Sequence, residues 1–176
     1  HYTGMRTEKS AIKRLTDIKF EVSSHYLIKQ NGEIITLVPD LYIAWHAGIS
    51  KWKKYESLNK NSIGIEITNP GHSFVYKKFP KQQILSLIKL TKFLISKYKI
   101  NKKNILGHSD IAPERKKDPG EKFPWEILAK NKISIWHTLD KKIILKMRNI
   151  ICNKKEIISF KRNLAKIGYP KCKIYY

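Results

Sequence analysis

Cysteines, acidic residues and long apolar runs are all scarce in this chain of 176 residues. Its two cysteines, Cys152 and Cys172, have no metal-ligand or redox spacing; they permit one disulfide without demanding it and leave the compartment open. No apolar run approaches the roughly 20 residues that span a bilayer, and the first four residues do not resemble a secretory leader. A hydrophobic content of 41% can bury one sizeable core, which predicts one main domain.

The shortage of acidic residues leaves a formal net charge of +22, from 36 Lys+Arg against 14 Asp+Glu. Such a charge attracts polyanions, among them nucleic acid, anionic lipid and wall polymer. Lys, Ile and Asn recur throughout, as in residues 99–104, which an AT-rich coding sequence also produces without any selection for a polyanion. The aromatic residues are not interleaved with the basic runs as a stacking platform requires. We therefore expect no specific nucleic acid partner, and an association with an anionic wall or membrane surface stays open.

The strongest local signal is a β-hairpin. Asn31-Gly32 separates two strand-like runs, residues 21–30 and residues 33–38. An Asn-Gly pair in this position favours a type I′ turn.

A strand, helix, strand order follows the hairpin. In residues 63–67 the isoleucines alternate onto one face, and Glu66 falls on the other face. Apolar residues recur at helical spacing over residues 81–98, which predicts an amphipathic helix laid on a sheet. A short apolar strand over residues 104–107 would then deliver His108 at its end. This order is typical of α/β proteins.

The last forty or so residues differ in composition from the rest. Prolines make residues 113–124 an irregular loop, and the composition shifts after about Trp136. A further helix is predicted where apolar residues share a face, and Gly168 is placed to end it. One helix of this size cannot bury its own apolar stripe, so the tail either packs on the main domain or begins a small module.

A candidate metal site lies around the proline-rich loop. His108 and Asp118 are ten positions apart (118 − 108), and the loop between them can bring both side chains to one point. A third donor would complete the arrangement of three ligands and one water found in catalytic zinc sites. His1, His25 and His46 are the candidates, and spacing alone does not choose among them. A His and an Asp in a loop are more often solvated or cap a turn.

Six stretches carry a family resemblance, in family order from the first residue to about Trp125. They are residues 1–3, 22–28, 44–48, 62–67, 107–113 and 115–120. The chain resembles the type 2 N-acetylmuramoyl-L-alanine amidases, zinc enzymes that include anhydromuropeptide amidases, the phage T7 type lysozyme and animal peptidoglycan recognition proteins. The resemblance implies an α/β fold with a mixed central β-sheet flanked by helices. It also implies hydrolysis of the amide between N-acetylmuramic acid, or its 1,6-anhydro form, and L-alanine, in cell wall turnover or recycling.

The resemblance, and not the spacing, assigns the site. It makes His1, His108 and Asp118 the ligands of one zinc ion (Zn2+). Glu66 matches the catalytic acidic residue, and Lys116, two positions before Asp118, matches the site lysine that stabilises an oxyanion.

Three further residues are implied near the site. His25 is then not a ligand and would lie near the site, behind the ligands. Trp45 and His46 match a segment that lines the cleft, where an aromatic face could pack on sugar or peptide. For Trp45 the alternative is simple core packing.

The resemblance also predicts the domain organisation. Residues 1–136 form the catalytic domain, with a first strand truncated at the N-terminus, because an apolar strand precedes the matching histidine in the family. The alternative is that His1 is a true N-terminus whose α-amino group also binds metal, as in a copper-like chelate. Residues 137–176 form a helical tail, in which residues 160–169 resemble the opening helix of a small peptidoglycan-binding module; a lone packing helix is the alternative.

Location and partners follow from the same likeness. Amidases with such a module are typically exported, so we expect the protein in the periplasm or at the outer membrane, with the cytoplasm as the alternative. We also expect a monomer. The expected partner is peptidoglycan or a released anhydromuropeptide. The competing function is a peptidoglycan-binding protein of the same fold that has lost catalysis.

Overall fold

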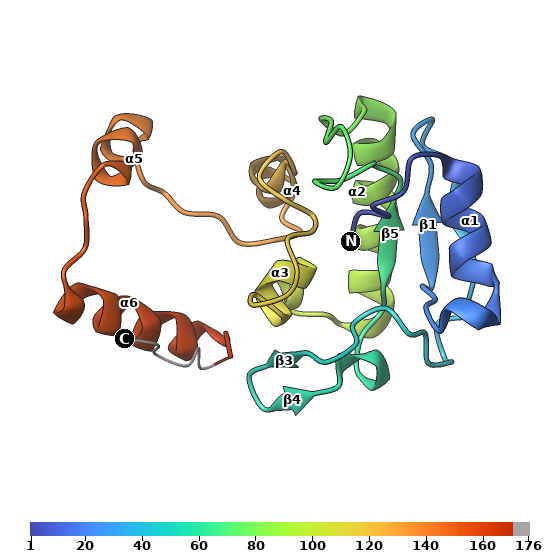
Figure 1. Cartoon of the computed structure of the whole chain (residues 1–176), viewed down its shortest axis with the longest axis horizontal. Coiled ribbons are helices and arrows are strands. Elements are labelled where there is room, and N and C mark those ends of the chain that lie inside the picture. Colours follow the sequence, from blue (N-terminus) through green and yellow to red (C-terminus); the bar gives the residue numbers. More distant parts are fainter. Residues whose placement is uncertain (171–176) are drawn as a thin grey trace.

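The computed structural model describes residues 1–170 as a mixed sheet flanked by helices, with a pair of helices set to one side (Figure 1). The sheet has the strand order β2, β1, β5, where β1 is Tyr26–Ile28, β2 is Ile34–Thr36 and β5 is Ile65–Ile67. β1 pairs antiparallel with β2 and parallel with β5. The predicted α/β class with a mixed central sheet is confirmed.

The predicted hairpin is confirmed, but the predicted type I′ turn is wrong. A type I′ turn needs positive φ at both central residues, and of Asn31 and Gly32 only Gly32, at 89°, has it. The amide of Gly32 donates to the carbonyl oxygen of Lys29, and the amide of Lys29 donates to that of Glu33, both at 2.9 Å. The turn thus centres one residue earlier, on Gln30 and Asn31, and Gly32 takes the left-handed position after it.

The predicted long helix is confirmed as α2, Lys81–Tyr98. It packs on the isoleucine face of β1 and β5 to form the main core, whose buried members include Tyr26, Ile28, Ile67, Ile84, Leu87 and Leu94. The helix ends at Tyr98, and Lys99, at φ 53°, is its C-cap. Because the isoleucines of β5 face α2, the opposite face of that strand is left for Glu66.

A helix that no sequence pattern predicted, α1 (Glu8–Thr16), lies beside β1 and away from α2 (Figure 1). It begins with a capping box in which the amide of Ser10 donates to the Thr7 hydroxyl at 3.1 Å and the amide of Thr7 donates to the Ser10 hydroxyl at 3.3 Å. Its buried residues are Ala11 and Leu15. A 3₁₀ turn, η1 (Ile18–Phe20), follows it.

The strand predicted over residues 104–107 is wrong. The 3₁₀ turn η3, Lys102–Asn104, is followed by irregular residues that lead directly into α3, His108–Ile111. Ile105 of this segment and Ile65 of β5 both line a cavity of about 670 Å³. A strand needs a neighbour for its backbone groups, and no strand in the described part of the chain lies against these residues.

The remaining elements frame the site and form the tail. β3 (Lys51–Trp52) and β4 (Tyr55–Glu56) form an antiparallel pair, η2 is Leu58–Lys60, and α4 is Trp125–Lys130 after the predicted irregular loop. The tail contains α5 (Lys141–Arg148) and α6 (Lys154–Ile167), which stand apart from the main body in Figure 1. None of the helices within residues 1–170 is long and apolar enough to cross a membrane.

The end of the tail returns to the main body. Gly168, at φ 140°, ends α6 as predicted, and its carbonyl oxygen accepts from the amide of Lys53 at 2.8 Å. The ring of Tyr169 packs edge-on against Trp52, with centroids 5.1 Å apart. Cys152 is exposed, and Cys172, the other half of the one disulfide that the sequence permits, lies outside the described residues.

Candidate metal centre

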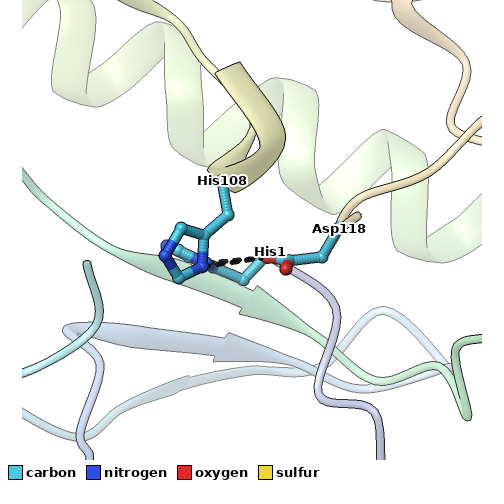
Figure 2. Close-up of side chains that lie close together, drawn as sticks. All are labelled: His1, His108 and Asp118. Carbon is cyan, nitrogen blue, oxygen red and sulfur yellow. Dashed lines mark hydrogen bonds and ion pairs between the residues drawn. The ribbon is translucent and has the colours of Figure 1, made fainter. Parts of the chain in front are cut away.

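Three side chains from distant parts of the chain converge on one point, as Figure 2 shows for His1, His108 and Asp118. Nδ1 of His1 lies 2.9 Å from Nδ1 of His108 and 3.0 Å from Oδ2 of Asp118. Nδ1 of His108 lies 3.3 Å from the same Oδ2. His1 is positioned by its neighbour Tyr2, which forms a parallel bridge with Ile67 of β5. His108 is the first residue of α3, and Asp118 lies on the proline-rich loop.

The donor set fits a divalent cation. Nε2 of His108 donates to the carbonyl oxygen of Ala47 at 2.9 Å, so Nδ1 of that ring presents a lone pair. Nδ1 of His1 and Oδ2 of Asp118 lie beside this nitrogen. The lone pairs of the three atoms repel one another unless a proton or a cation lies between them. A tetrahedral ion with bonds of about 2.0–2.2 Å spaces its donors by roughly 3.3–3.6 Å, within a few tenths of an ångström of these separations.

A proton is also stabilised at this point. Burial lowers the pKa of His1, but the hydrogen bond to Asp118 and the charge of Glu66 outweigh burial, so the pKa is raised. Burial raises the pKa of the Asp118 carboxyl, but the hydrogen bond with His1 and the nearby ring of His108 hold it well below its ordinary value. A proton and a metal ion therefore compete for the same three atoms.

The α-amino group of His1 is engaged elsewhere. It donates to the carbonyl oxygen of Ile65 in β5 at 2.9 Å. A copper-like chelate would need this amine and the imidazole on the same ion. The geometry therefore favours the imidazole of His1 as its metal-binding group.

Glu66 is a buried carboxyl without a partner. It lies on β5, on the face opposite the isoleucines, and Oε2 has no hydrogen-bond partner among the described residues. Burial raises the pKa of Glu66 to about 7. A carboxyl that titrates near neutral pH is suited to accept and return a proton.

A cleft of about 500 Å³ joins these groups. It is lined by residues that include His1, Glu66, His108, Lys116 and Asp118, together with Ala11, Arg14 and Leu15 of α1. Lys116 is half-buried, and its charge acts to lower the pKa of Glu66. Lys117 also borders the cleft but is exposed. The cleft therefore brings a candidate base and an ammonium group to the metal centre.

The other candidate residues lie at different depths. His46 is buried in the cleft wall, with Nδ1 3.3 Å from Nε2 of His1. His25 lies behind it, with ring centroids 5.6 Å apart, and its Nδ1 accepts from the amide of Gly64 at 3.0 Å. Trp45 is 48% exposed, so it is not a core residue, and it does not line this cleft. Of the three histidines that spacing left open, only His1 joins His108 and Asp118.

Sequence reasoning gave no role to two residues behind the site. Oδ1 of Asn59 accepts from the amides of His46 and Ala47. Arg115 donates to the carbonyl oxygens of Ala47 and Ile49. Asn59 lies 13 positions from His46 and belongs to no motif, so no spacing signal could have found it.

A mixed sheet that brings two imidazoles, a carboxylate and a buried glutamate to one cleft defines a class of α/β proteins with a candidate single-metal centre. Within that class, the family model described as N-acetylmuramoyl-L-alanine amidase matches residues 1–121. The chain belongs to this family, which is of a metal-dependent type. The resemblance seen in the sequence is thus confirmed.

Curated proteins of similar sequence are named as amidases. The chain is 43% identical over 148 residues to the N-acetylmuramoyl-L-alanine amidase AmiD of Escherichia coli (strain K12), covering 77% of this chain and 52% of that protein. It is 43% identical over 104 residues to the 1,6-anhydro-N-acetylmuramyl-L-alanine amidase AmpD of the same strain, covering 59% and 55% respectively. The chain therefore spans about half the length of the curated relatives that it matches.

Solved structures extend the likeness to the tail. The complex of E. coli AmiD with anhydro-N-acetylmuramic acid-L-Ala-D-gamma-Glu-L-Lys has a TM-score of 0.81 at 36% identity, covering 100% of this chain and 72% of that one. The structure of AmpDh3 from Pseudomonas aeruginosa has a TM-score of 0.83 at 30% identity, covering 100% and 74%. The match to a crystal structure of an AmpD derivative covers only 62% of this chain and 59% of the AmpD chain, with a TM-score of 0.58 at 39% identity.

Proposed function

We propose that this chain is a zinc-dependent amidase that hydrolyses the bond between N-acetylmuramic acid, or its 1,6-anhydro form, and L-alanine of the peptidoglycan stem peptide. The convergence of His1, His108 and Asp118 beside Glu66 in one cleft is the observation that carries the proposal. Family membership supports it, as does the likeness to an amidase solved with an anhydromuramoyl peptide substrate.

His1, His108 and Asp118 would hold one zinc ion. Two imidazole nitrogens and one carboxylate oxygen are donors that catalytic zinc sites use, with a further position left for water. Bound zinc supplies a water with a pKa of about 7 and polarises the scissile carbonyl.

Glu66 is the proposed general base and acid. Its carboxylate takes the proton of the attacking water and passes it to the nitrogen of the leaving L-alanine, so that the amide C–N bond breaks to give a free amine. The pKa of about 7, raised by burial, suits both transfers at neutral pH. The free Oε2 is available for this contact because no described residue occupies it.

Lys116 is proposed to stabilise the negative charge that develops on the scissile carbonyl oxygen. One such donor is typically worth roughly 3 kcal/mol in the transition state. Lys116 is the half-buried lysine of the cleft, whereas its neighbour Lys117 is exposed. The burial difference supports the role that the family resemblance gives to Lys116.

Trp45 and the tail are proposed to serve substrate binding outside the catalytic cleft. The half-exposed ring of Trp45 offers an aromatic face to sugar or peptide. Residues 137–176 are proposed to begin a peptidoglycan-binding module; the likeness to AmiD and AmpDh3, which continues beyond the catalytic region of this chain, supports this. We further propose that the protein works in the periplasm or at the outer membrane; cell fractionation would test this location.

The direct test supplies the purified chain with zinc and an anhydromuramoyl peptide. We expect free stem peptide and free sugar in equal amounts by mass spectrometry. Treatment with a chelator should abolish release, and added zinc should restore it. If the zinc-loaded chain binds the muropeptide but releases no peptide, the proposal is wrong and the alternative, a peptidoglycan-binding protein of the same fold, replaces it.

A further inference from the structure

Two consecutive residues serve both histidines of the candidate metal centre. Nδ1 of His46 lies 3.3 Å from Nε2 of His1. The carbonyl oxygen of the next residue, Ala47, accepts from Nε2 of His108 at 2.9 Å. The outer nitrogen of each ligand ring is thus satisfied by one short segment of chain.

These contacts determine which ring nitrogen is protonated. A carbonyl oxygen can only accept, so Nε2 of His108 carries the proton and Nδ1 is free to bind an ion. If Nδ1 of His1 also binds the ion, its proton lies on Nε2, and Nδ1 of His46 is the acceptor beside it. Both ligand rings are then held with Nδ1 toward the metal.

The side chain of Asn59, in η2, holds this segment in place. Its Oδ1 accepts from the amide of His46 at 3.1 Å and from the amide of Ala47 at 2.7 Å. Backbone amides of both residues are thereby pinned to one oxygen atom. Loss of that oxygen would leave two donors without their acceptor in a half-buried place, which permits the segment to shift.

Arg115 holds the same segment from the other side. Its guanidinium donates to the carbonyl oxygen of Ala47 and, from Nε at 2.9 Å, to that of Ile49. Nη2 also lies 3.2 Å from Nε2 of His108, but both atoms carry protons, so the two share the Ala47 oxygen instead of bonding to each other. The guanidinium fork thus fixes the acceptor on which the orientation of His108 depends.

Gly64 gives the ring of His46 its place. A Cβ on Gly64 would lie 2.3 Å from Cγ of His46, closer than any side chain permits. The ring therefore packs directly on the backbone of the segment that leads into β5. The ring of His46 therefore cannot move toward the sheet. The ring of His1 lies on its other side, with the two ring centroids 5.4 Å apart.

We infer that His46 and Ala47 form a positioning element that orients both ligand histidines, and that Asn59 and Arg115 hold this element in place. The inference rests on the proposed metal centre, although it does not depend on which amide is cleaved. Partners of this kind behind metal ligands typically change metal affinity 10–100-fold when removed.

The test measures zinc affinity of the full chain by competition with a fluorescent chelator. We expect Asn59→Ala to bind zinc about 10–100-fold more weakly than the wild type. Asn59→Asp keeps an oxygen acceptor and should recover most of the affinity. Asn61→Ala, at an exposed asparagine two positions away, is the matched control and should bind as the wild type does.

A second measurement separates positioning from general destabilisation. Long-range proton–nitrogen NMR spectra of the metal-free protein report which nitrogen of each ring is protonated. The wild type should show His108 with its proton on Nε2, and Asn59→Ala should show a mixture. A folded Asn59→Ala protein with wild-type zinc affinity and an unchanged ring would overturn the inference.

If Asn59→Ala does not fold, Arg115→Lys decides the matter, because it keeps the charge and loses the fork. An affinity about tenfold lower supports the inference, and an unchanged affinity overturns it. The outcome is independent of the amidase proposal. A wild type that cleaves no muropeptide while the variants rank as expected would refute the amidase proposal alone, and an active wild type whose variants bind zinc normally would refute the positioning alone.

Discussion

Oδ2 of Asp118 lies 3.0 Å from Nδ1 of His1, although 117 positions separate the two residues in the chain. The contact joins the segment that runs beside β5 to the loop that follows α3. Burial opposes ionisation of the Asp118 carboxyl, but the hydrogen bond with His1 and the nearby ring of His108 lower its pKa and keep a negative charge at this junction. An ion bound there would therefore link the two ends of the catalytic region and stabilise the folded state.

Removal of one metal ligand should remove metal and activity together. His108→Ala or Asp118→Ala leaves two donors where three converge, so we expect less than about one tenth of the wild-type zinc content by elemental analysis and no measurable amide cleavage. His137→Ala, at an exposed histidine of the tail, is the control and should keep both. Full zinc content in either ligand variant would contradict the assigned site.

Glu66→Gln should separate chemistry from metal binding. The amide cannot accept the proton of water, so turnover should fall about 10²–10⁴-fold. Zinc content should stay at the wild-type level, because Glu66 does not belong to the ligand cluster. Near wild-type turnover in this variant would show that another group is the base.

The same substitution should change stability with pH in the metal-free protein. Burial raises the folded-state pKa of Glu66 to about 7 from an ordinary value of 4.5, so its favourable contribution is present below pH 4.5 and is lost as pH rises through 7. Above pH 8 the buried charge should cost on the order of 3 kcal/mol. Glu66→Gln should therefore melt at a higher temperature than the wild type at pH 8 and at a similar one at pH 4.5; an equal difference at both pH values would contradict this.

Two adjacent lysines offer a matched pair. Lys116→Ala should lower kcat about 10²–10³-fold if its ammonium stabilises the developing oxyanion. Lys117→Ala should change kcat by less than about threefold, because its side chain is exposed at the rim of the cleft. Steady-state kinetics on one muropeptide measure both variants, and equal losses would indicate only a general effect of charge.

Tyr169 should anchor the tail to the main body. Its hydroxyl donates to one carboxylate oxygen of Asp110, whose other oxygen accepts from the amide of Gly107 at 2.7 Å. Burial, followed by the hydrogen bond to Asp110, raises the pKa of Tyr169. Tyr169→Phe should weaken this docking by about 1–3 kcal/mol, seen as faster hydrogen exchange in α6. Tyr55→Phe, at an exposed ring, is the control, and unchanged exchange in Tyr169→Phe would contradict the anchor.

Local periodicity in the sequence is enough to predict several elements of the fold. The bounds of α2, the hairpin and the position of Glu66 opposite the isoleucines of β5 all agree with the sequence patterns. Each of these features depends on residues that lie close together in the sequence, within one helix, one strand or one hairpin. The turn type and the strand over residues 104–107 were wrong, because each depends on which backbone group lies opposite, and residue spacing does not record this.

The sequence by itself determined the chemistry available to the site: histidines, a loop aspartate, a strand glutamate and a basic cleft segment, with a family likeness that gave them roles. Residue spacing left open which histidine joins His108 and Asp118, and the family likeness named His1; the tertiary structure brings His1, and not His25 or His46, beside them. It also placed Asn59 and Arg115 behind the ligands. The reason is physical: convergence requires the sheet, α3 and the proline-rich loop to pack together, and a contact across 117 positions leaves no periodic trace in the chain.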